Sequence, residues 1–229
     1  MTFAPTLIDA LAELIAPTRC AGCERQGVLF CPACLATLPR DYQPDQVCPV
    51  CAAPFGALAC TECWRDDFAF TRTVALGILD GPLARAVVLL KDANEQRLAD
   101  VLGTLLGERV HECWGSWAGT VTWIPASRAA IQRRGFDHAE LIARAVAKVL
   151  NVSATPLLQR PRSRDQRGLS RRQRLTGAQQ FTTGMDTLPR HILLVDDVFT
   201  TGATAHTATE ALLTAGAIEV RLGVLARAW

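Results

Sequence analysis

The sequence lacks the features that would place the chain in a membrane or an export pathway. No segment of its 229 residues reaches the run of about 18 apolar residues that a membrane-spanning helix needs. Residues 1–20 have no basic leader, and Asp9 and Glu13 interrupt their apolar stretch. We therefore expect a short amphipathic helix over residues 7–15 instead of a secretion signal, and a cytoplasmic protein without membrane insertion.

Lysine is also nearly absent. Of 24 basic residues only Lys91 and Lys148 are lysine, and the rest are arginine. An arginine excess can follow from genome composition alone, and a net charge of +2 favours no particular partner, so the arginines are informative only where they cluster. With 49% hydrophobic residues, the chain can bury the core of one full domain and carries a small additional region.

Cysteine, by contrast, is concentrated in the first quarter of the chain. A C-x-x-C turn directs two thiolates at one point, which is half of a tetrahedral zinc site, so four such turns predict two four-cysteine zinc sites. A disulfide framework would need an oxidising compartment, and an iron–sulfur cluster is a lesser alternative. The order in which the pairs combine stays open. Eight of the nine cysteines form the four pairs, namely Cys20/Cys23, Cys31/Cys34, Cys48/Cys51 and Cys60/Cys63.

This cysteine-rich segment is too short to build a core of its own, so we expect bound metal to fold it. Arg25, Arg40 and Arg65 are scattered among acids and form no basic face, which favours a structural role. We predict an N-terminal helix and double zinc-ribbon region over residues 1–68 and a second domain over residues 69–229. Cys113 lies apart from the pairs and is interpreted as a lone thiol without function.

From about residue 70 the pattern changes to alternating strands and helices. Aliphatic strands of this kind, buried on both faces, indicate an α/β fold with a mainly parallel sheet and helices on both faces. Ligands of such sheets bind beyond the carboxyl ends of the strands. We expect strands at 73–79, 120–125, 154–158, 191–197 and 218–226, and helices at 83–91, 97–110, 137–150 (with Asp137 as N-cap) and 203–214.

The segment 191-HILLVDDVFTTGAT-204 carries the clearest chemical signal. The strand ends in Asp196 and Asp197, whose carboxylates are suited to accept hydrogen bonds from the two hydroxyls of a ribose. The loop that follows offers three threonine hydroxyls, a glycine that permits close backbone approach, and the free amides of a helix start, which together form a cradle for a terminal phosphate. The segment therefore predicts a ribose 5-phosphate site. It is not an ATP-type P-loop, because G-x-x-x-x-G-K-[ST] is absent.

This loop resembles the phosphoribosyl diphosphate (PRPP) loop of type I phosphoribosyltransferases. With the cysteine pairs and the segments 89-LLKDANEQRLADVLG-103, 124-IPASRAAIQRRGFDHAELIA-143 and 166-QRGLSRRQR-174, nearly the whole chain is similar to the ComF competence family. The resemblance implies that Asp196 and Asp197 hold the ribose hydroxyls, with Mg²⁺ bridging ribose and pyrophosphate. It also implies that the 5-phosphate is wrapped by Thr200, Thr201, Gly202, Ala203 and Thr204.

Further basic residues are assigned by the same resemblance. Lys91 matches a lysine expected near the pyrophosphate, although a helix C-terminus also attracts solvated cations. Arg128, Arg133 and Arg134 follow the 120–125 strand, where they would contact pyrophosphate or DNA, or would lie on a solvated surface. We include Arg128 among the substrate-binding residues.

The chain departs from the family pattern at three places. Many relatives have Asn-Gln where this chain has Asp137 and His138, others have a glycine near Ala93-Asn94, and others an asparagine near Gly177. The missing glycine leaves the geometry of the pyrophosphate loop open. His138 could titrate near neutral pH, but a histidine at a helix start is expected to be structural or exposed.

A cluster of arginines precedes the PRPP loop in sequence, with Asp165 as its one acid. Its charge and low apolar content predict a mobile segment. In type I phosphoribosyltransferases such a loop closes over the site and excludes water. Gln166, Leu169, Ser170 and Arg174 match the family pattern. Arg174 is assigned a catalytic role together with Asp196 and Asp197. The alternatives are a strip that binds single-stranded DNA, or a solvated charged loop. The DNA-binding assignment covers Arg162, Arg164, Arg167, Arg171 and Arg172, and the full cluster adds Arg160 and Arg174.

Three functional hypotheses follow. The favoured one is a PRPP-binding, ComF-like protein that acts in DNA uptake and natural competence, contacts single-stranded DNA, and works with other competence proteins. The second is an active transferase that moves a ribosyl 5-phosphate from PRPP to an unknown nitrogen acceptor and releases pyrophosphate. The third, a zinc-stabilised interaction module with a vestigial site, is disfavoured by the intact Asp196-Asp197 pair and threonine loop.

Overall fold

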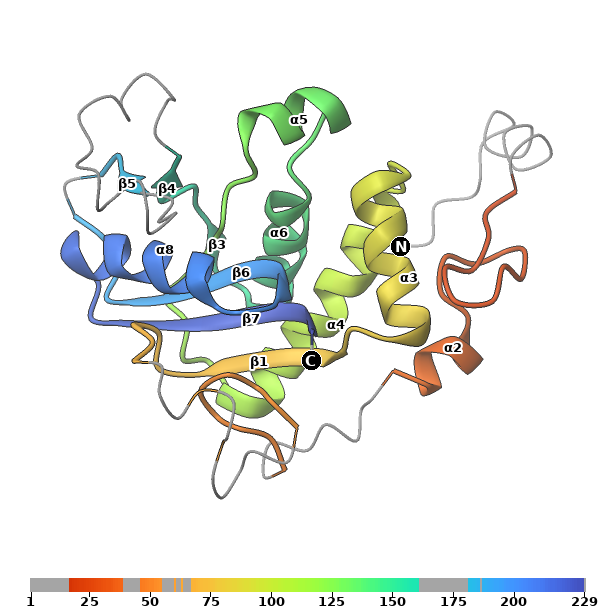
Figure 1. Cartoon of the computed structure of the whole chain (residues 1–229), viewed down its shortest axis with the longest axis horizontal. Helices are drawn as coiled ribbons and strands as arrows, with labels where there is room; N and C mark the ends of the chain where they lie inside the picture. Colours follow the sequence, from red (N-terminus) through yellow and green to blue (C-terminus); the bar gives the residue numbers. More distant parts are fainter. Residues whose placement is uncertain are drawn as a thin grey trace.

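The computed structural model describes residues 17–38, 46–54, 60, 63, 67–160, 181–185 and 187–228. Its centre is a five-stranded sheet with the order β1-β7-β6-β2-β3, in which every neighbouring pair is parallel. Figure 1 shows β1, β7 and β6 running side by side. The α/β prediction with a mainly parallel sheet is confirmed. The strands are β1 (Thr73–Ile78), β2 (Thr120–Trp123), β3 (Ser153–Ala154), β6 (His191–Phe199) and β7 (Glu219–Arg227).

Helices cover both faces of this sheet. Successive residues of a strand point to opposite sides, so β6 contributes to a hydrophobic cluster on each face. Leu193 and Val195 of β6 pack in one cluster with α3 (Gly81–Asp92), α4 (Arg97–Trp114) and α6 (His138–Leu150). Ile192 and Leu194 of the same strand pack in a second cluster with α8 (Ala203–Thr214). Within the described ranges no helix is long and apolar enough to cross a membrane.

Local signals explain several helix boundaries. Asp137 caps α6 as predicted, since its side chain accepts a hydrogen bond from the amide of Ala139. The sequence analysis missed the short helix α5 (Arg128–Arg134), although Ser127 caps its start and Gly135, with φ of +84°, ends it in a left-handed conformation. The predicted helix over 203–214 coincides with α8.

The single strand predicted over residues 154–158 is wrong. The structure has two short strands there, β3 in the main sheet and β4 (Leu158–Gln159), which pairs antiparallel with β5 (Thr182–Thr183) in a separate two-stranded sheet. Pro156 lies between them and has no amide hydrogen to donate to a strand ladder. Leu157 instead donates a hydrogen bond to the carbonyl of Thr155, which turns the chain.

The cysteine-rich region does not pack apart from the α/β core. Cys20, Cys31 and Cys34, with the small helix α2 (Pro32–Ala36) beginning directly after Cys31, belong to the cluster that includes α3 and α4. Cys48 and Cys51 belong to the cluster under α8. The boundary between residues 68 and 69 stays a prediction. The expected helix over residues 7–15 lies outside the described residues.

Candidate functional site

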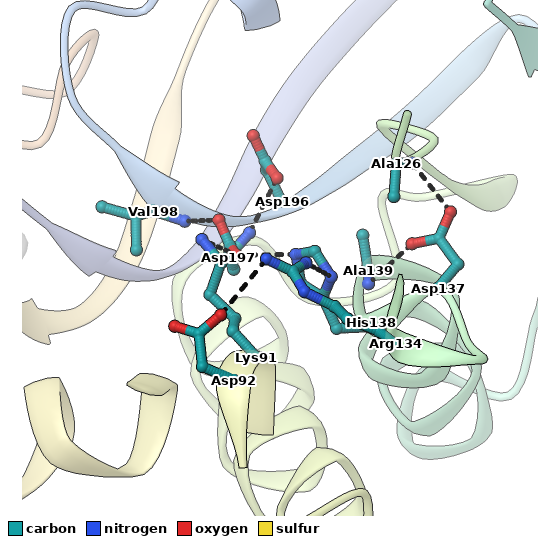
Figure 2. Close-up of polar contacts among 10 residues, drawn as sticks. All are labelled: Lys91, Asp92, Ala126, Arg134, Asp137, His138, Ala139, Asp196, Asp197 and Val198. Atoms are coloured by element: carbon teal, nitrogen blue, oxygen red, sulfur yellow. Dashed lines mark hydrogen bonds and ion pairs between the residues drawn. The ribbon is translucent and has the colours of Figure 1, made fainter. Parts of the chain in front are cut away.

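The two adjacent carboxylates lie near the carboxyl end of β6, on opposite faces of the sheet. Asp197 lies on the same face of β6 as Leu193 and Val195 and points towards α3 and α6 (Figure 2). Asp196 lies on the opposite face, with Ile192 and Leu194. The amide of Asp197 donates a hydrogen bond of 2.9 Å to Asp196 Oδ1. The pair therefore presents one carboxylate to each side of the strand end.

Asp197 is buried and held by two side chains from different helices. Its Oδ2 lies 2.6 Å from Lys91 Nζ and 2.7 Å from His138 Nε2, while its Oδ1 accepts a 2.6 Å hydrogen bond from the amide of Val198. Burial alone would raise the pKa of this carboxyl, but the hydrogen bond from His138 and the charge of Lys91 lower the pKa to about 2. Asp197 is therefore a fixed anion at neutral pH.

Asp196 has the opposite electrostatics. Desolvation and the neighbouring charge of Asp197 raise the pKa of its carboxyl well above the usual value, against smaller opposing effects of Lys91 and Arg160. Arg160 approaches from the end of β4, where its Nε donates to the carbonyl of Pro125 and its guanidinium lies 5.1 Å from the centre of the Phe181 ring. A ligand that donates hydrogen bonds to Asp196 would favour its charged form.

His138 is the site residue that the sequence analysis missed. It was expected to be structural or exposed, but it is buried at the start of α6 with its Nε2 on Asp197. Arg134 Nη1 lies 3.2 Å from His138 Nδ1, and Arg134 Nη2 lies 3.5 Å from Asp92 Oδ1. Because an arginine only donates, Nδ1 acts as the acceptor, and the neutral Nε2–H tautomer satisfies both contacts. The departure from the family pattern at this position was the available signal.

The threonine loop is built around Gly202. Its φ of +77° lies in the left-handed region, and a Cβ placed on it would lie 2.8 Å from ring atoms of Phe68 and Phe199. Thr200, Thr201 and Ala203 are exposed, and Thr204 is half-buried. A small cavity of about 40 Å³ is lined by Asp196, Thr200 and residues 202–205 beside the N-terminus of α8. An anion in this cavity would meet the free amides of the helix start.

The loop after Lys91 preserves a left-handed residue without glycine. Asn94 has φ of +59°, a conformation that asparagine tolerates better than other side chains. Asparagine therefore makes the turn at which the resemblance led us to expect a glycine. Lys91 itself lies in the last turn of α3 and contacts Asp197 instead of extending into open solvent.

The remaining predicted basic residues divide into two groups. Arg128 and Arg133 of α5 are exposed, and among the described residues the side chain of Arg128 makes no hydrogen bond or ion pair. Only Arg134 of that helix is joined to the site, through His138. The other predicted residues of the arginine cluster lie outside the described residues, namely Arg162, Arg164, Arg167, Arg171, Arg172 and Arg174.

The eight paired cysteines form two groups, each of which combines successive pairs. The first four-cysteine group is Cys20, Cys23, Cys31 and Cys34, and the second is Cys48, Cys51, Cys60 and Cys63. Their sulfur atoms lie within 4.8 Å of one another in each group, with Cys23–Cys31, Cys48–Cys63 and Cys51–Cys60 separations of 3.6, 3.6 and 3.5 Å. A tetrahedral zinc site with Zn–S bonds of about 2.3 Å has sulfur atoms about 3.8 Å apart, so both groups could hold zinc. All nine cysteines are free thiols, which argues against the disulfide alternative.

Without a cation, burial and mutual repulsion oppose the presence of four thiolates in each group. Burial, followed by the neighbouring thiols, raises the pKa of Cys34 to about 12, and burial raises the pKa of Cys51 to about 12. Burial would raise the pKa of Cys20 as well, but amide hydrogen bonds from Cys31 and Cys23 outweigh it and lower the pKa to about 6. A bound Zn²⁺ would supply the charge that makes all four sulfurs thiolates in each group.

A comparison with known protein families supports the fold assignment. The family model of the phosphoribosyl transferase domain matches residues 129–228, which include β6, the threonine loop and α8. The chain therefore carries a phosphoribosyltransferase-like α/β domain. A solved glutamine PRPP amidotransferase from B. subtilis aligns over 54% of this chain and 25% of its own, with 22% identity and a TM-score of 0.39, too partial to indicate function.

Two curated relatives extend over most of the chain. Competence protein F of Haemophilus influenzae is 26% identical over 223 residues, covering 91% of this chain and 90% of the relative. DNA utilization protein YhgH of Salmonella typhi is 28% identical over 194 residues, covering 81% and 86%. Together with the matched domain, these relatives support the assignment of the chain to the ComF family.

Proposed function

We propose that this protein binds PRPP with Mg²⁺ and acts in DNA uptake. The observation that carries the proposal is the arrangement at the end of β6, where Asp197 is fixed by Lys91 and His138 beside a threonine loop at a helix start. Asp196 and Asp197 would contact the ribose and its Mg²⁺, residues 200–204 the 5-phosphate, and Lys91 the pyrophosphate. The names of the two relatives support the role in DNA use.

Calorimetric titration of the full chain with Mg-PRPP tests the first part of this proposal. We expect saturable binding that depends on Mg²⁺ and that ribose 5-phosphate competes for, because both ligands share the phosphate and the ribose hydroxyls. Absence of binding to PRPP at millimolar concentration would overturn the assignment of the site.

Contact with single-stranded DNA is the second part, and it rests on the arginine cluster. Fluorescence anisotropy of a labelled oligonucleotide over a salt series, with and without Mg-PRPP, measures it directly. Steeply salt-dependent binding that Mg-PRPP alters would support a competence factor whose site senses the metabolite. Absence of DNA binding at moderate salt, with PRPP still bound, would contradict it.

An active phosphoribosyltransferase is the second candidate function, and the completeness of the polar site favours it over a vestigial one. Lys91, His138 and Asp197 form direct contacts across three elements, as expected of a site kept for ligand chemistry. Release of pyrophosphate from Mg-PRPP in the presence of nitrogen bases would demonstrate this activity. If PRPP binds but no acceptor causes release of pyrophosphate, only the binding role remains.

A further inference from the structure

Arg227, in the last strand of the sheet, joins the second four-cysteine group to the threonine loop. Its side chain is buried, and its Nε donates a 3.1 Å hydrogen bond to the carbonyl of Cys51. Its Nη1 donates to the carbonyls of Phe199 at 3.3 Å and Thr200 at 2.9 Å. One guanidinium therefore contacts two main-chain segments. One is the turn from Cys48 to Cys51, called the cysteine knuckle below, and the other is the start of the threonine loop.

These contacts make the position of the guanidinium sensitive to both segments. A buried cation held by carbonyl groups loses much of its stabilisation if one of those carbonyls moves away, because no water replaces it. The guanidinium also lies 4.6 Å from the centre of the Phe199 ring. The carbonyls of Cys51, Phe199 and Thr200 are therefore joined through a single rigid, planar group.

An aromatic contact runs parallel to this polar one. Phe199 packs edge-on against Phe68 and Phe70, with ring centres 6.0 and 5.9 Å away, and the rings of Phe68 and Phe199 enclose Gly202. Phe68 follows Cys63 by five positions in the chain. The conformation of Gly202 therefore depends on the packing of a segment that leaves the second cysteine group.

The main chain of the cysteine knuckle is followed by a residue in an unfavourable backbone conformation. Ala52, next to Cys51, is fully buried with φ of +55°, and the amides of Cys48 and Ala52 close a tight turn on the carbonyls of Ala53 and Cys48. A left-handed alanine costs about 1 kcal/mol or more and persists only where the surroundings impose it. The four sulfurs of this group would impose it when a metal joins them.

We propose that Arg227 is a positioning residue that couples metal binding in the second four-cysteine group to the shape of the threonine loop. Loss of that metal would release the Cys51 carbonyl, shift Arg227 and loosen residues 199–202, which weakens phosphate binding. The consequence for phosphate rests on the proposed function, whereas the coupling itself does not.

The first four-cysteine group provides a matched control, because its contacts lead elsewhere. Gly22 packs against Pro82 at the start of α3, Glu24 pairs with Arg85 of the same helix, and Thr18 accepts a 3.0 Å hydrogen bond from Arg97 of α4. None of these contacts reaches the threonine loop. Cys23 is the exposed member of the first group, and Cys60 is a half-buried member of the second, so both are suitable for substitution.

Hydrogen exchange of the ligand-free, zinc-loaded full chain tests the coupling, with native mass spectrometry to count bound metal. In Cys60→Ser and in Arg227→Lys we expect amide exchange of residues 200–206 to rise about tenfold, the effect of removing one good hydrogen bond. Cys23→Ser should lose its metal without this change, and Arg227→Lys should keep both metals. The double variant Cys60→Ser/Arg227→Lys should exceed the single variants by no more than about twofold, because both remove the same link.

A merely structural role of Arg227 predicts a different result, namely faster exchange throughout β6 and β7 and additive effects in the double variant. Either that pattern, or an unchanged loop in Cys60→Ser, would overturn the proposal. If Arg227→Lys fails to fold, the comparison of Cys60→Ser with Cys23→Ser decides alone. A second readout is Mg-PRPP affinity, which we expect to fall about tenfold in the same two single variants. If the wild type binds no PRPP but the exchange pattern holds, the proposed function fails and the coupling stands.

Discussion

Asp196 and Asp197 are neighbours in the chain, but their carboxylates lie on opposite faces of β6 and have opposite pKa shifts. Asp197 is stabilised as an anion by His138 and Lys91, whereas burial and the charge of Asp197 disfavour the anion of Asp196. In the absence of ligand, the carboxylate of Asp197 stabilises the fold and that of Asp196 destabilises it. Substitutions at the two positions should therefore differ in their effect on stability and agree in their effect on binding.

Asp197→Asn should weaken Mg-PRPP binding about a hundredfold. It removes the negative charge from the proposed contacts with the ribose and with its Mg²⁺, which contribute roughly 1.5 kcal/mol or more each. The zinc content should not change, because the cysteine groups do not touch this carboxylate in the described residues. Calorimetry and metal analysis measure the two quantities. Asp100→Asn, an exposed acid in the first turn of α4, is the control. Unchanged PRPP affinity in Asp197→Asn would show that the ligand binds elsewhere.

Asp196→Asn should raise the melting temperature of the ligand-free protein while it weakens Mg-PRPP binding. Its raised pKa means that ionisation at neutral pH opposes folding, and an amide removes that cost and the repulsion from Asp197. Thermal unfolding at pH 7 with and without Mg-PRPP provides both results. A lower melting temperature without ligand would contradict the electrostatic description of this carboxyl.

The stabilisation by Asp197 should disappear in acid. Its pKa in the folded protein is about 2 against 3.8 ordinarily, so its contribution is complete above about pH 4 and is lost as the pH falls towards 2. The difference between these pKa values corresponds to roughly 2 kcal/mol. Denaturant unfolding of the wild type and Asp197→Asn from pH 7 to pH 2 should therefore show two curves that converge at the acid end. A gap that stays constant over this range would assign the effect of the substitution to packing.

Gly202→Ala should disrupt the threonine loop more than its backbone conformation alone explains. The new Cβ would meet Phe68 and Phe199 at 2.8 Å, in addition to the strain of a left-handed alanine of about 1 kcal/mol. Gly216→Ala is the matched control, since Gly216 has φ of +105° and no atom near the place of its Cβ. We expect phosphate and PRPP affinity to fall at least about tenfold in Gly202→Ala only. Equal affinities of the two variants would exclude residue 202 from the binding site.

The arginine cluster should set the salt dependence of DNA binding. Replacing Arg162, Arg164, Arg167, Arg171 and Arg172 by glutamine should reduce the slope of log K against log salt by about 0.7 for each DNA phosphate that is no longer neutralised. Anisotropy titrations over a salt series measure this slope. Replacing the exposed Arg128 and Arg133 of α5 is the comparison. If only the second substitution flattens the slope, α5 is the DNA-contacting element.

The sequence by itself determined much of this protein, because the decisive signals are local. Buried aliphatic runs predicted β1, β6 and β7, the cap at Asp137 predicted the start of α6, and the C-x-x-C spacing predicted the metal-ligand pairs. The order of threonines and glycine after two acids predicted the loop at the start of α8. Each of these depends on residues within one turn or one strand of each other.

Only the tertiary structure decided which of these elements meet. Lys91, His138 and Asp197 come from three elements, and no periodicity predicts that their side chains share one carboxylate. The combination of successive cysteine pairs and the link from Cys51 through Arg227 to Thr200 likewise bring together distant parts of the chain. Such contacts depend on how the helices pack on the sheet, since burial rewards close packing of the whole core and not the separation of residues in sequence.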